Sequence, residues 1–194
     1  MITLVTGGAR SGKSQFAEQF AASISTNGMY IATAQAFDQE MRERIALHRT
    51  QRDNESFHWE TWEAPLQLTH CLESILRHIE DNELLEEPVI LIDCMTIWLS
   101  NWFMELDVEN TGNEQLLDAI DTLLEYLQQY PYSIIIVSNE VGSGIVPRNK
   151  LGRMYRDEAG RLNQRIATLA DKVFLVTAGI PLELKSLAYK LEGH

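Results

Sequence analysis

Short apolar runs rich in β-branched residues alternate with amphipathic stretches along most of the chain. The runs predict buried strands because they are short and nearly all apolar, and they cover residues 2–6, 29–33, 89–94, 133–139 and 172–178. The amphipathic stretches predict helices over approximately 13–26, 38–52, 65–80, 95–104, 113–130 and 150–170. Such alternation gives a mostly parallel sheet with helices on both faces. The expected fold class is therefore α/β.

Two further runs extend the predicted sheet. Residues 57–63 alternate between apolar and polar side chains, as a strand does. Residues 182–186 follow Gly179-Ile180-Pro181 and are expected to return as an antiparallel edge strand at the C-terminus. With 194 residues, 45% of them hydrophobic, the chain can bury one sizeable core, so residues 1–194 are expected to form a single domain.

Composition and charge exclude several classes of protein. The net charge of −12 repels phosphate backbones and argues against general nucleic-acid binding. Cys71 and Cys94 are too few for a disulfide framework. No apolar stretch approaches the ~18 residues of a membrane helix, and the N-terminal apolar run is too short for a signal peptide. We expect no membrane span and a cytoplasmic location.

The first predicted strand leads directly into a phosphate-binding motif. The motif G-x-x-x-x-G-K-[ST] is matched by Gly7, Gly8, Ala9, Arg10, Ser11, Gly12, Lys13 and Ser14. Glycines let backbone N–H groups turn towards phosphate oxygens, and the helix that follows adds its positive end. Lys13 is expected to neutralise the β and γ phosphates, and the Ser14 hydroxyl is expected to ligate Mg²⁺.

Other polar side chains follow the ends of later strands, where ligands of parallel sheets bind. Asp93 ends an apolar run and is a candidate Mg²⁺ ligand, or alternatively the N-cap of the helix expected from about Met95. Residues 139–147, NEVGSGIVP, follow another strand. They predict either a flexible active-site segment or a plain loop with turn glycines.

Basic residues concentrate in two segments of this acidic chain. Residues 42–52 and 148–165 hold four and six of the 16 basic residues. The concentration predicts that an anion meets these segments, although two ordinary charged helix faces would have the same composition. In the second segment Arg153, Asp157 and Arg161 share one helix face, as an ion-pair ladder or a substrate wall would.

His48 lies within the first basic segment. On a helix it would share a face with Ile45 and Arg52, with Arg44 and Arg49 nearby. Neighbouring cations favour the neutral, nucleophilic imidazole, and arginines suit the phosphates of what it would attack. The alternative is a surface or packing histidine.

Taken together, five stretches carry a resemblance to a known family. They read VTGGARSGKSQFAE, YIATAQ, DQEMRERIALHR, LIDCMTIWLSN and SNEVGSGIVPRNKLGRMYRDEAGRLNQRIA, and they extend to about Asp171. The chain resembles the bifunctional adenosylcobinamide kinase / adenosylcobinamide-phosphate guanylyltransferase family of cobalamin nucleotide-loop assembly. The resemblance implies a RecA-like P-loop sheet, a homotrimer, and the partners GTP, ATP, adenosylcobinamide and its phosphate. It also implies two reactions: phosphorylation of adenosylcobinamide, and transfer of GMP from GTP through an enzyme histidine.

The family's site residues map onto this sequence position by position. Its guanylylated histidine falls on His48, because of the position after RIAL. Its nucleotide contacts fall on Gly7 to Ser14, Ala32, Thr33, Ala34, Arg49, Thr50, Gln51, Arg52, Glu63 and Asp93. Glu60 offers a competing alignment for Glu63 in WETWEA. A single-function P-loop kinase of a small molecule is the alternative function, and a nucleotide-gated switch is a third.

Overall fold

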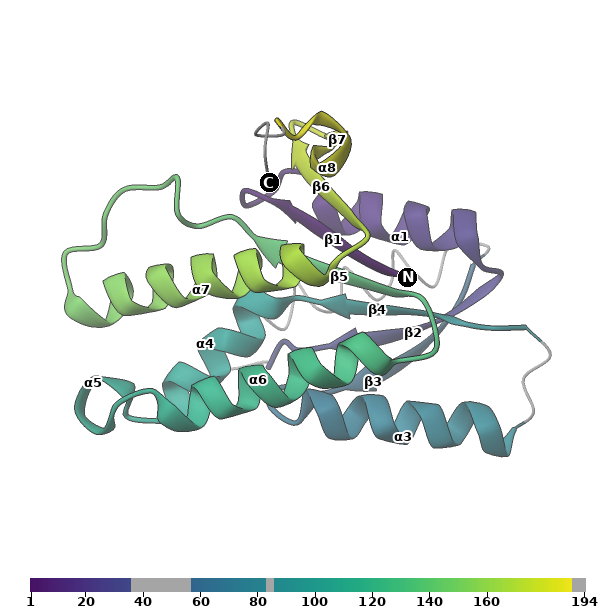
Figure 1. Cartoon of the computed structure of the whole chain (residues 1–194), viewed down its shortest axis with the longest axis horizontal. Helices are drawn as coiled ribbons and strands as arrows, with labels where there is room; N and C mark the ends of the chain where they lie inside the picture. The colour runs from purple at the N-terminus through teal and green to yellow at the C-terminus, as the bar shows by residue number, and fades with distance from the viewer. Residues whose placement is uncertain (36–56, 83–85, 190–194) are drawn as a thin grey trace.

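The computed structural model describes residues 1–35, 57–82 and 86–189 (Figure 1). Its strands are β1 (Ile2–Gly7), β2 (Asn27–Ala32), β3 (His58–Glu63), β4 (Val89–Asp93), β5 (Ile134–Asn139), β6 (Lys172–Thr177) and β7 (Ile180–Glu183). Its helices are α1 (Lys13–Ile24), α3 (Leu68–Asp81), α4 (Met95–Glu105), α5 (Val108–Thr111), α6 (Glu114–Gln129), α7 (Lys150–Leu169) and α8 (Leu184–Leu187).

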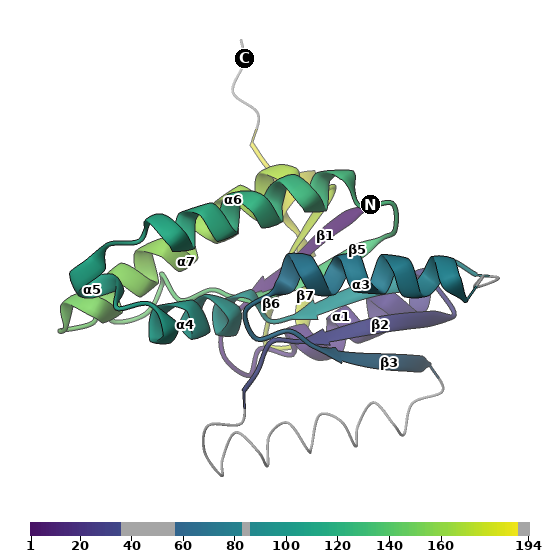
Figure 2. The same ribbon diagram turned by 90° about the horizontal axis from the view of Figure 1, so that it is seen from below.

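The strands form one sheet in the order β3-β2-β4-β5-β1-β6-β7. All neighbours pair in parallel except β6 and β7, which are antiparallel. Figure 2 shows β2 and β3 side by side at one border of the sheet, and Figure 1 shows β6 and β7 at the other. The predicted α/β fold is confirmed, including an antiparallel edge strand at the C-terminal end.

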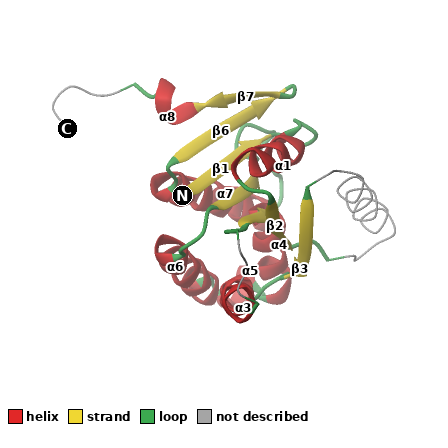
Figure 3. Ribbon diagram, turned by 90° about the vertical axis from the view of Figure 1, so that its right-hand side faces the viewer, coloured by secondary structure: helices red, strands yellow, loops and turns green. Residues whose placement is uncertain are grey.

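Helices cover both faces of the sheet (Figure 3). One core cluster joins alternate residues of the strands, such as Ile31 and Ile92, to the apolar stripes of α3, α4, α6 and α7. The other cluster joins the intervening strand residues, such as Tyr30 and Leu91, to α1. Because side chains alternate across a strand, the continuous apolar runs found in the sequence are what a sheet buried on both faces requires.

The C-terminal edge differs from the expected strand at 182–186. Ala178 (φ 51°) and Gly179 (φ 79°) form a tight turn, so antiparallel pairing begins at once, with Ile180 opposite Thr177. The side chain of Glu183 accepts hydrogen bonds from the amides of Lys185 and Ser186 and starts α8, which ends the strand. The expected strand is therefore wrong by two residues at its start, and its second half is helical.

Three other expectations have different outcomes. The helices expected over 95–104 and 113–130 are present, and the short helix α5 lies between them. The helix expected over 38–52 lies outside the described residues. Within the described ranges, no helix combines the length and apolar character needed to span a bilayer.

The packing of α3 on the sheet provides a test of this core. Leu72 is fully buried on α3, whereas Met104 on α4 is 64% exposed. Leu72→Ala should lower the free energy of unfolding by about 2–5 kcal/mol, because it removes buried methyl groups and leaves a cavity. The control Met104→Ala should change it by less than about 0.5 kcal/mol. Urea denaturation of the two variants measures both values, and equal losses would contradict this packing.

Candidate nucleotide-binding site

The parallel register brings the last residues of five strands to one edge of the sheet, here called the rim. Ala32 lies opposite both Glu63 and Asp93, and Gly7 lies opposite Asn139. Asp93 itself pairs with Val137, two residues before Asn139 on β5. Residues from β1 to β5, far apart in sequence, therefore meet at the edge from which the glycine loop emerges.

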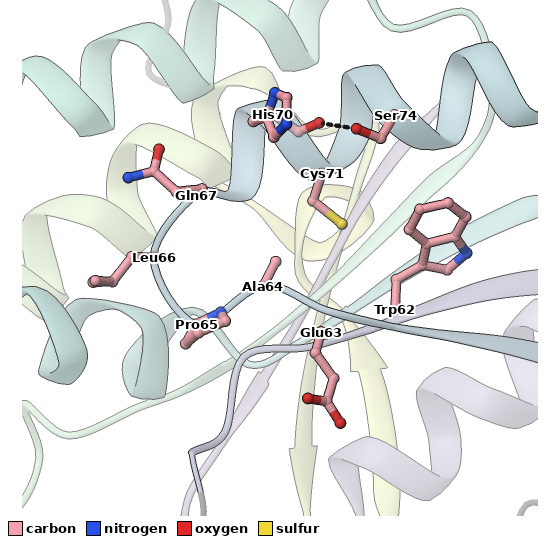
Figure 4. Close-up of a pocket in the computed structure, with 9 residues that line it drawn as sticks. All are labelled: Trp62, Glu63, Ala64, Pro65, Leu66, Gln67, His70, Cys71 and Ser74. Carbon is pink, nitrogen blue, oxygen red and sulfur yellow. Dashed lines mark hydrogen bonds between the residues drawn. The ribbon is translucent and has the colours of Figure 1, made fainter.

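Strand alternation also decides which face of the sheet these rim side chains occupy. Ile92 and Trp62 pack with the α3 and α4 cluster, so Asp93 and Glu63, which follow them, face the α1 side. Figure 4 shows the Glu63 carboxylate pointing away from the Trp62 ring on the opposite side of β3. The hydroxyl of Tyr30, which belongs to the α1-side cluster, donates to Oδ2 of Asp93 at 3.0 Å.

The glycine loop spans residues 8–12 between β1 and α1. Arg10 (φ 56°) and Gly12 (φ 92°) adopt left-handed backbone conformations, which turn successive peptide groups inward. Lys13 begins α1 and is 8% exposed, and its Nζ donates to the carbonyl of Gly8 at 3.2 Å. A helix N-terminus that follows such a loop is an anion-binding site, because its first N–H groups and its dipole favour negative charge.

The turn after β6 supports this loop from behind. Gly179 donates its N–H to the carbonyl of Ser11 at 2.8 Å. A Cβ on Gly7 would lie 2.4 Å from the backbone oxygen of Val176, and a Cβ on Gly12 would lie 3.2 Å from the Cα of Gly179. The sequence did not predict this contact of Gly179 with the loop, because the two segments are far apart in the chain.

Asp93 does not cap the helix that follows it. The N-cap of α4 is Cys94, and no side chain makes a capping hydrogen bond there, so that alternative is wrong. A carboxylate from Asp93 and a hydroxyl from Ser14 are hard oxygen donors, and Mg²⁺ in nucleotide sites takes one or two such protein ligands beside phosphates and water. The donor types of Asp93 and Ser14 therefore fit Mg²⁺.

Thr33, a predicted nucleotide contact, uses its side chain to join two loops. It is fully buried, and its hydroxyl donates to the carbonyl of Cys94 and accepts from the Cys94 amide, both at 2.8 Å. Asn101 of α4 donates to the carbonyls of Thr33 and Pro65 at 2.8 and 2.9 Å. Asn101 was not among the predicted site residues, although a lone amide within the apolar helix segment MTIWLSNWF is a usable signal.

The structure separates the two glutamates that competed in the alignment. Glu60 lies inside β3, and its carboxylate pairs with Nε2 of His78 on α3 at 3.2 Å. Glu63 ends the strand at the rim. An open cavity of about 440 Å³ lies where β3 meets α3, lined by Trp62, Glu63, Ala64, Pro65, Leu66, Gln67, His70, Cys71 and Ser74 (Figure 4).

The segment after β5 divides into two parts. The carboxylate of Glu140 accepts hydrogen bonds from the amides of Gly142 and Ser143, at 2.8 and 3.2 Å. Partial burial raises the pKa of Glu140, but the hydrogen bonds from Ser143 and Gly142 outweigh that effect and lower it overall. Ile145 is almost wholly exposed. Residues 140–147 therefore form a mostly exposed loop, whereas Asn139 ends β5 at the rim.

Most basic side chains of the second segment contact other groups of the protein. Arg156 and Arg161 pair with Asp157 and Glu158 on α7 itself, and Arg165 pairs with Asp121 of α6 at 2.5 Å. Arg153 donates to the carbonyls of Pro147 and Arg148 instead of joining a ladder. These contacts favour the charged-face alternative for 148–165 over an anion site.

Five predicted site residues lie outside the described part of the chain: His48, Arg49, Thr50, Gln51 and Arg52. The predicted role of the basic segment 42–52 therefore stays a prediction from sequence.

The sheet order, the glycine loop and the rim define a P-loop nucleotide-binding protein. Among solved structures, an ATPase domain matches with a TM-score of 0.51, covering 90% of this chain and 68% of that one. At 14% sequence identity, this similarity concerns the fold alone.

Sequence comparison identifies the family within that class. The family described as cobinamide kinase / cobinamide phosphate guanyltransferase matches residues 3–184. The bifunctional adenosylcobalamin biosynthesis protein CobP of Pseudomonas aeruginosa is 44% identical, covering 95% of this chain and 98% of the relative. The CobU proteins of Salmonella typhimurium and Escherichia coli K12 are 38% and 39% identical, each covering 95% of this chain and 100% of the relative. The chain belongs to this family of bifunctional enzymes.

Two adjacent glycines provide a matched test of the loop geometry. Gly7→Ala should destabilise the protein by more than about 1 kcal/mol, because its Cβ would collide with the carbonyl of Val176. Gly8→Ala places its Cβ in open space, with nothing within 4 Å, and should stay within about 0.5 kcal/mol of wild type. Urea denaturation measures both variants, and equal stability for the two would contradict the close approach of β1 to β6.

Proposed function

We propose that this chain catalyses both reactions of its family, with one triphosphate site serving the two. The observation that carries the proposal is the meeting of the glycine loop with Asp93, Ala32 and Glu63 on one face of the rim. The family match over residues 3–184 supports the chemistry. The substrates are GTP, ATP, adenosylcobinamide and adenosylcobinamide phosphate.

The glycine loop is proposed to hold the triphosphate. Backbone N–H groups of residues 8–13 and the N-terminus of α1 bind the β and γ phosphates, and Lys13 adds a positive charge to them. The carbonyl of Gly8, which holds Lys13 Nζ in this structure, keeps the ammonium group beside the loop. Glu63 at the end of β3 and the backbone of residues 32–34 are proposed to contact the nucleoside.

In the kinase reaction, the aminopropanol hydroxyl of adenosylcobinamide attacks the γ-phosphorus. A new O–P bond forms, the bond from the γ-phosphorus to the β–γ bridging oxygen breaks, and the hydroxyl proton passes to solvent. Catalysis of this kind depends on alignment and on stabilising charge at the equatorial oxygens. Glu140 is a poor base for that proton, because its lowered pKa and its own loop hold it as a hydrogen-bonded carboxylate.

In the guanylyl reaction, the imidazole of His48 is proposed to attack the α-phosphorus of GTP. A P–N bond forms and pyrophosphate leaves. A phosphate oxygen of adenosylcobinamide phosphate then attacks the same phosphorus, the P–N bond breaks, and adenosylcobinamide-GDP forms. The assignment rests on the position of His48 after RIAL and on the arginines beside it, and a covalent intermediate divides one difficult displacement into two easier ones.

Ser14 and Asp93 are proposed to hold Mg²⁺, with the Tyr30 hydroxyl orienting the Asp93 carboxylate. The metal would neutralise charge on the β and γ phosphate oxygens.

A homotrimer and a cytoplasmic location remain our predictions from the family resemblance and the composition.

The histidine assignment predicts a separation of the two activities. Wild-type protein incubated with GTP and Mg²⁺ should gain the mass of one GMP, which is lost in acid, and peptide masses should place it on His48. His48→Ala should lose the adduct and the guanylyl transfer completely, because the nucleophile is gone. It should retain phosphorylation of adenosylcobinamide, since the glycine loop is unchanged.

Replacement of His70, which is exposed on α3, by alanine serves as the matched histidine control and should leave both activities intact. Phosphoryl transfer without any adduct in the wild type would instead indicate a single-function P-loop kinase. An adduct that persists in His48→Ala would assign the nucleophile to another residue.

Substitution of the two glutamates of β3 should have different effects on the affinity for GTP. Glu63→Gln should weaken GTP binding by about tenfold or more, because a charged hydrogen-bonding partner at the rim is lost. Glu60→Gln should leave GTP binding within about twofold, since Glu60 contacts His78 on α3. Isothermal titration calorimetry with GTP compares the two, and the reverse order would favour the alternative alignment.

A further inference from the structure

Asn139 is a rim residue to which the proposed function assigns no role. It ends β5, the strand between β1 and β4, and it lies opposite Gly7 at the start of the glycine loop. On the other neighbouring strand, Asp93 pairs with Val137, two residues before Asn139. Strand alternation puts Val137, Asn139 and Asp93 on the α1 side, where the loop ends and α1 begins. Asn139 therefore ends the strand that lies between the strand of the proposed metal ligand and the strand that leads into the phosphate-binding loop.

The backbone around Asn139 is fixed from two directions. The next residue, Glu140, donates its N–H to the carbonyl of Gly7 at 3.0 Å. Behind the sheet, Asn163 of α7 donates to the carbonyl of Asn139 at 3.0 Å and accepts from Ser138 Oγ at 2.6 Å. The end of β5 is thus held by both β1 and α7.

The carboxamide of Asn139 is fixed as well. Its Nδ2 donates to Thr96 Oγ1 at 3.0 Å, and its backbone N–H points to the same oxygen at 3.4 Å. Thr96 Oγ1 also lies 3.2 Å from Cys94 Sγ, in a hydrogen bond that either group can donate. The Thr96 carbonyl is in turn bound by the Tyr155 hydroxyl at 2.9 Å. The amide nitrogen is therefore held at the rim with one hydrogen bonded to Thr96.

The end of β5 is thus fixed through its backbone by β1 and α7, and its side-chain amide is fixed by α4. Among the described residues, Asn139 Nδ2 bonds to Thr96 alone, so its second hydrogen has no acceptor within the described ranges. A preorganised N–H donor beside a phosphate-binding loop suits a developing negative charge, because it needs no reorganisation when the charge appears. Asparagine side chains supply such donors in other transfer reactions.

We propose that Asn139 donates its second Nδ2 hydrogen to an oxygen of the γ-phosphoryl group during transfer to the alcohol. This inference rests on the proposed kinase reaction. Asn139 forms and breaks no covalent bond; it stabilises charge while the O–P bond forms and the bond to the leaving diphosphate breaks. Thr96 is a positioning residue, because it acts through the amide.

The two chemistries of this family supply an internal control. In the kinase reaction the γ-phosphoryl group is transferred, so a donor to its oxygens bears on the transition state. In the guanylyl reaction the bond broken is at the α-phosphorus, and the γ group leaves as part of pyrophosphate. A γ-phosphoryl donor should therefore matter for one reaction and hardly for the other, whereas a purely structural residue would affect both.

Asn139→Ala should lower kcat of the kinase reaction by about 10²-fold, as removal of a single such donor does. The KM for nucleotide, and the rate of GMP-adduct formation with GTP and Mg²⁺, should stay within about threefold. Asn139→Asp keeps the shape of the side chain but cannot donate, so it should lose at least as much kinase activity. The melting temperature of each variant, followed by circular dichroism, shows whether the fold is retained. If Asn139→Ala is unstable, Asn139→Asp takes its place in the test.

Two further variants separate catalysis from structure. Asn82 ends α3 and bonds to the carbonyl of His78 at 2.8 Å, so Asn82→Ala removes a comparable asparagine contact and should leave the kinase rate unchanged. Thr96→Val, which removes the acceptor for Nδ2, should lower kinase kcat partially, and Thr96→Ser should recover most of that loss.

Equal losses in both reactions, or no loss in either, would overturn the role of Asn139. Loss confined to the guanylyl reaction would overturn it too. Absence of both activities from the wild-type protein would instead refute the proposed function, and this inference with it.

Discussion

The parallel pairing of β2, β4, β5 and β1 is the constraint on which the rest of the structure depends. This pairing aligns Ala32, Asp93, Asn139 and Gly7 at one edge of the sheet, and the pleat turns the side chains of Ala32, Asp93 and Asn139 to one face. The glycine loop begins where β1 ends, so it emerges at the same edge of the sheet as Asp93 of β4 and Asn139 of β5. A one-residue slip of any strand would send its rim side chain to the α3 side.

Polar contacts made by buried side chains then hold the loops that leave the rim. Thr33 joins the segments after β2 and β4, and Asn101 joins the segments after β2 and β3. Burial, followed by the nearby Asp93 carboxylate, raises the pKa of the Cys94 thiol to about 11, so it stays protonated among these contacts. Loops fixed in this way present their backbone groups in one arrangement, which suits a site that binds without reorganising.

Much of this arrangement could be predicted from local sequence. The glycine motif, the strand before it and the helix after it are contiguous, and burial on both faces makes each strand a recognisable apolar run. The contact of Gly179 with Ser11 and the role of Asn101 were not predictable in that way, because each depends on segments that meet only in the folded sheet. The ion pair between Arg165 and Asp121 was not predictable from the basic segment 148–165 for the same reason, since Asp121 lies on another helix.

The sequence by itself determined the α/β class, the phosphate-binding loop, the family and the prediction for His48, since each is written in contiguous residues. Only the tertiary structure placed Glu63 at the rim and Glu60 against α3, excluded Asp93 as a helix cap, and set where the C-terminal edge strand begins. Those outcomes depend on strand register and on which contacts a side chain makes in the folded chain. Neither is settled until the strands pair, because the same local pattern is compatible with more than one pairing.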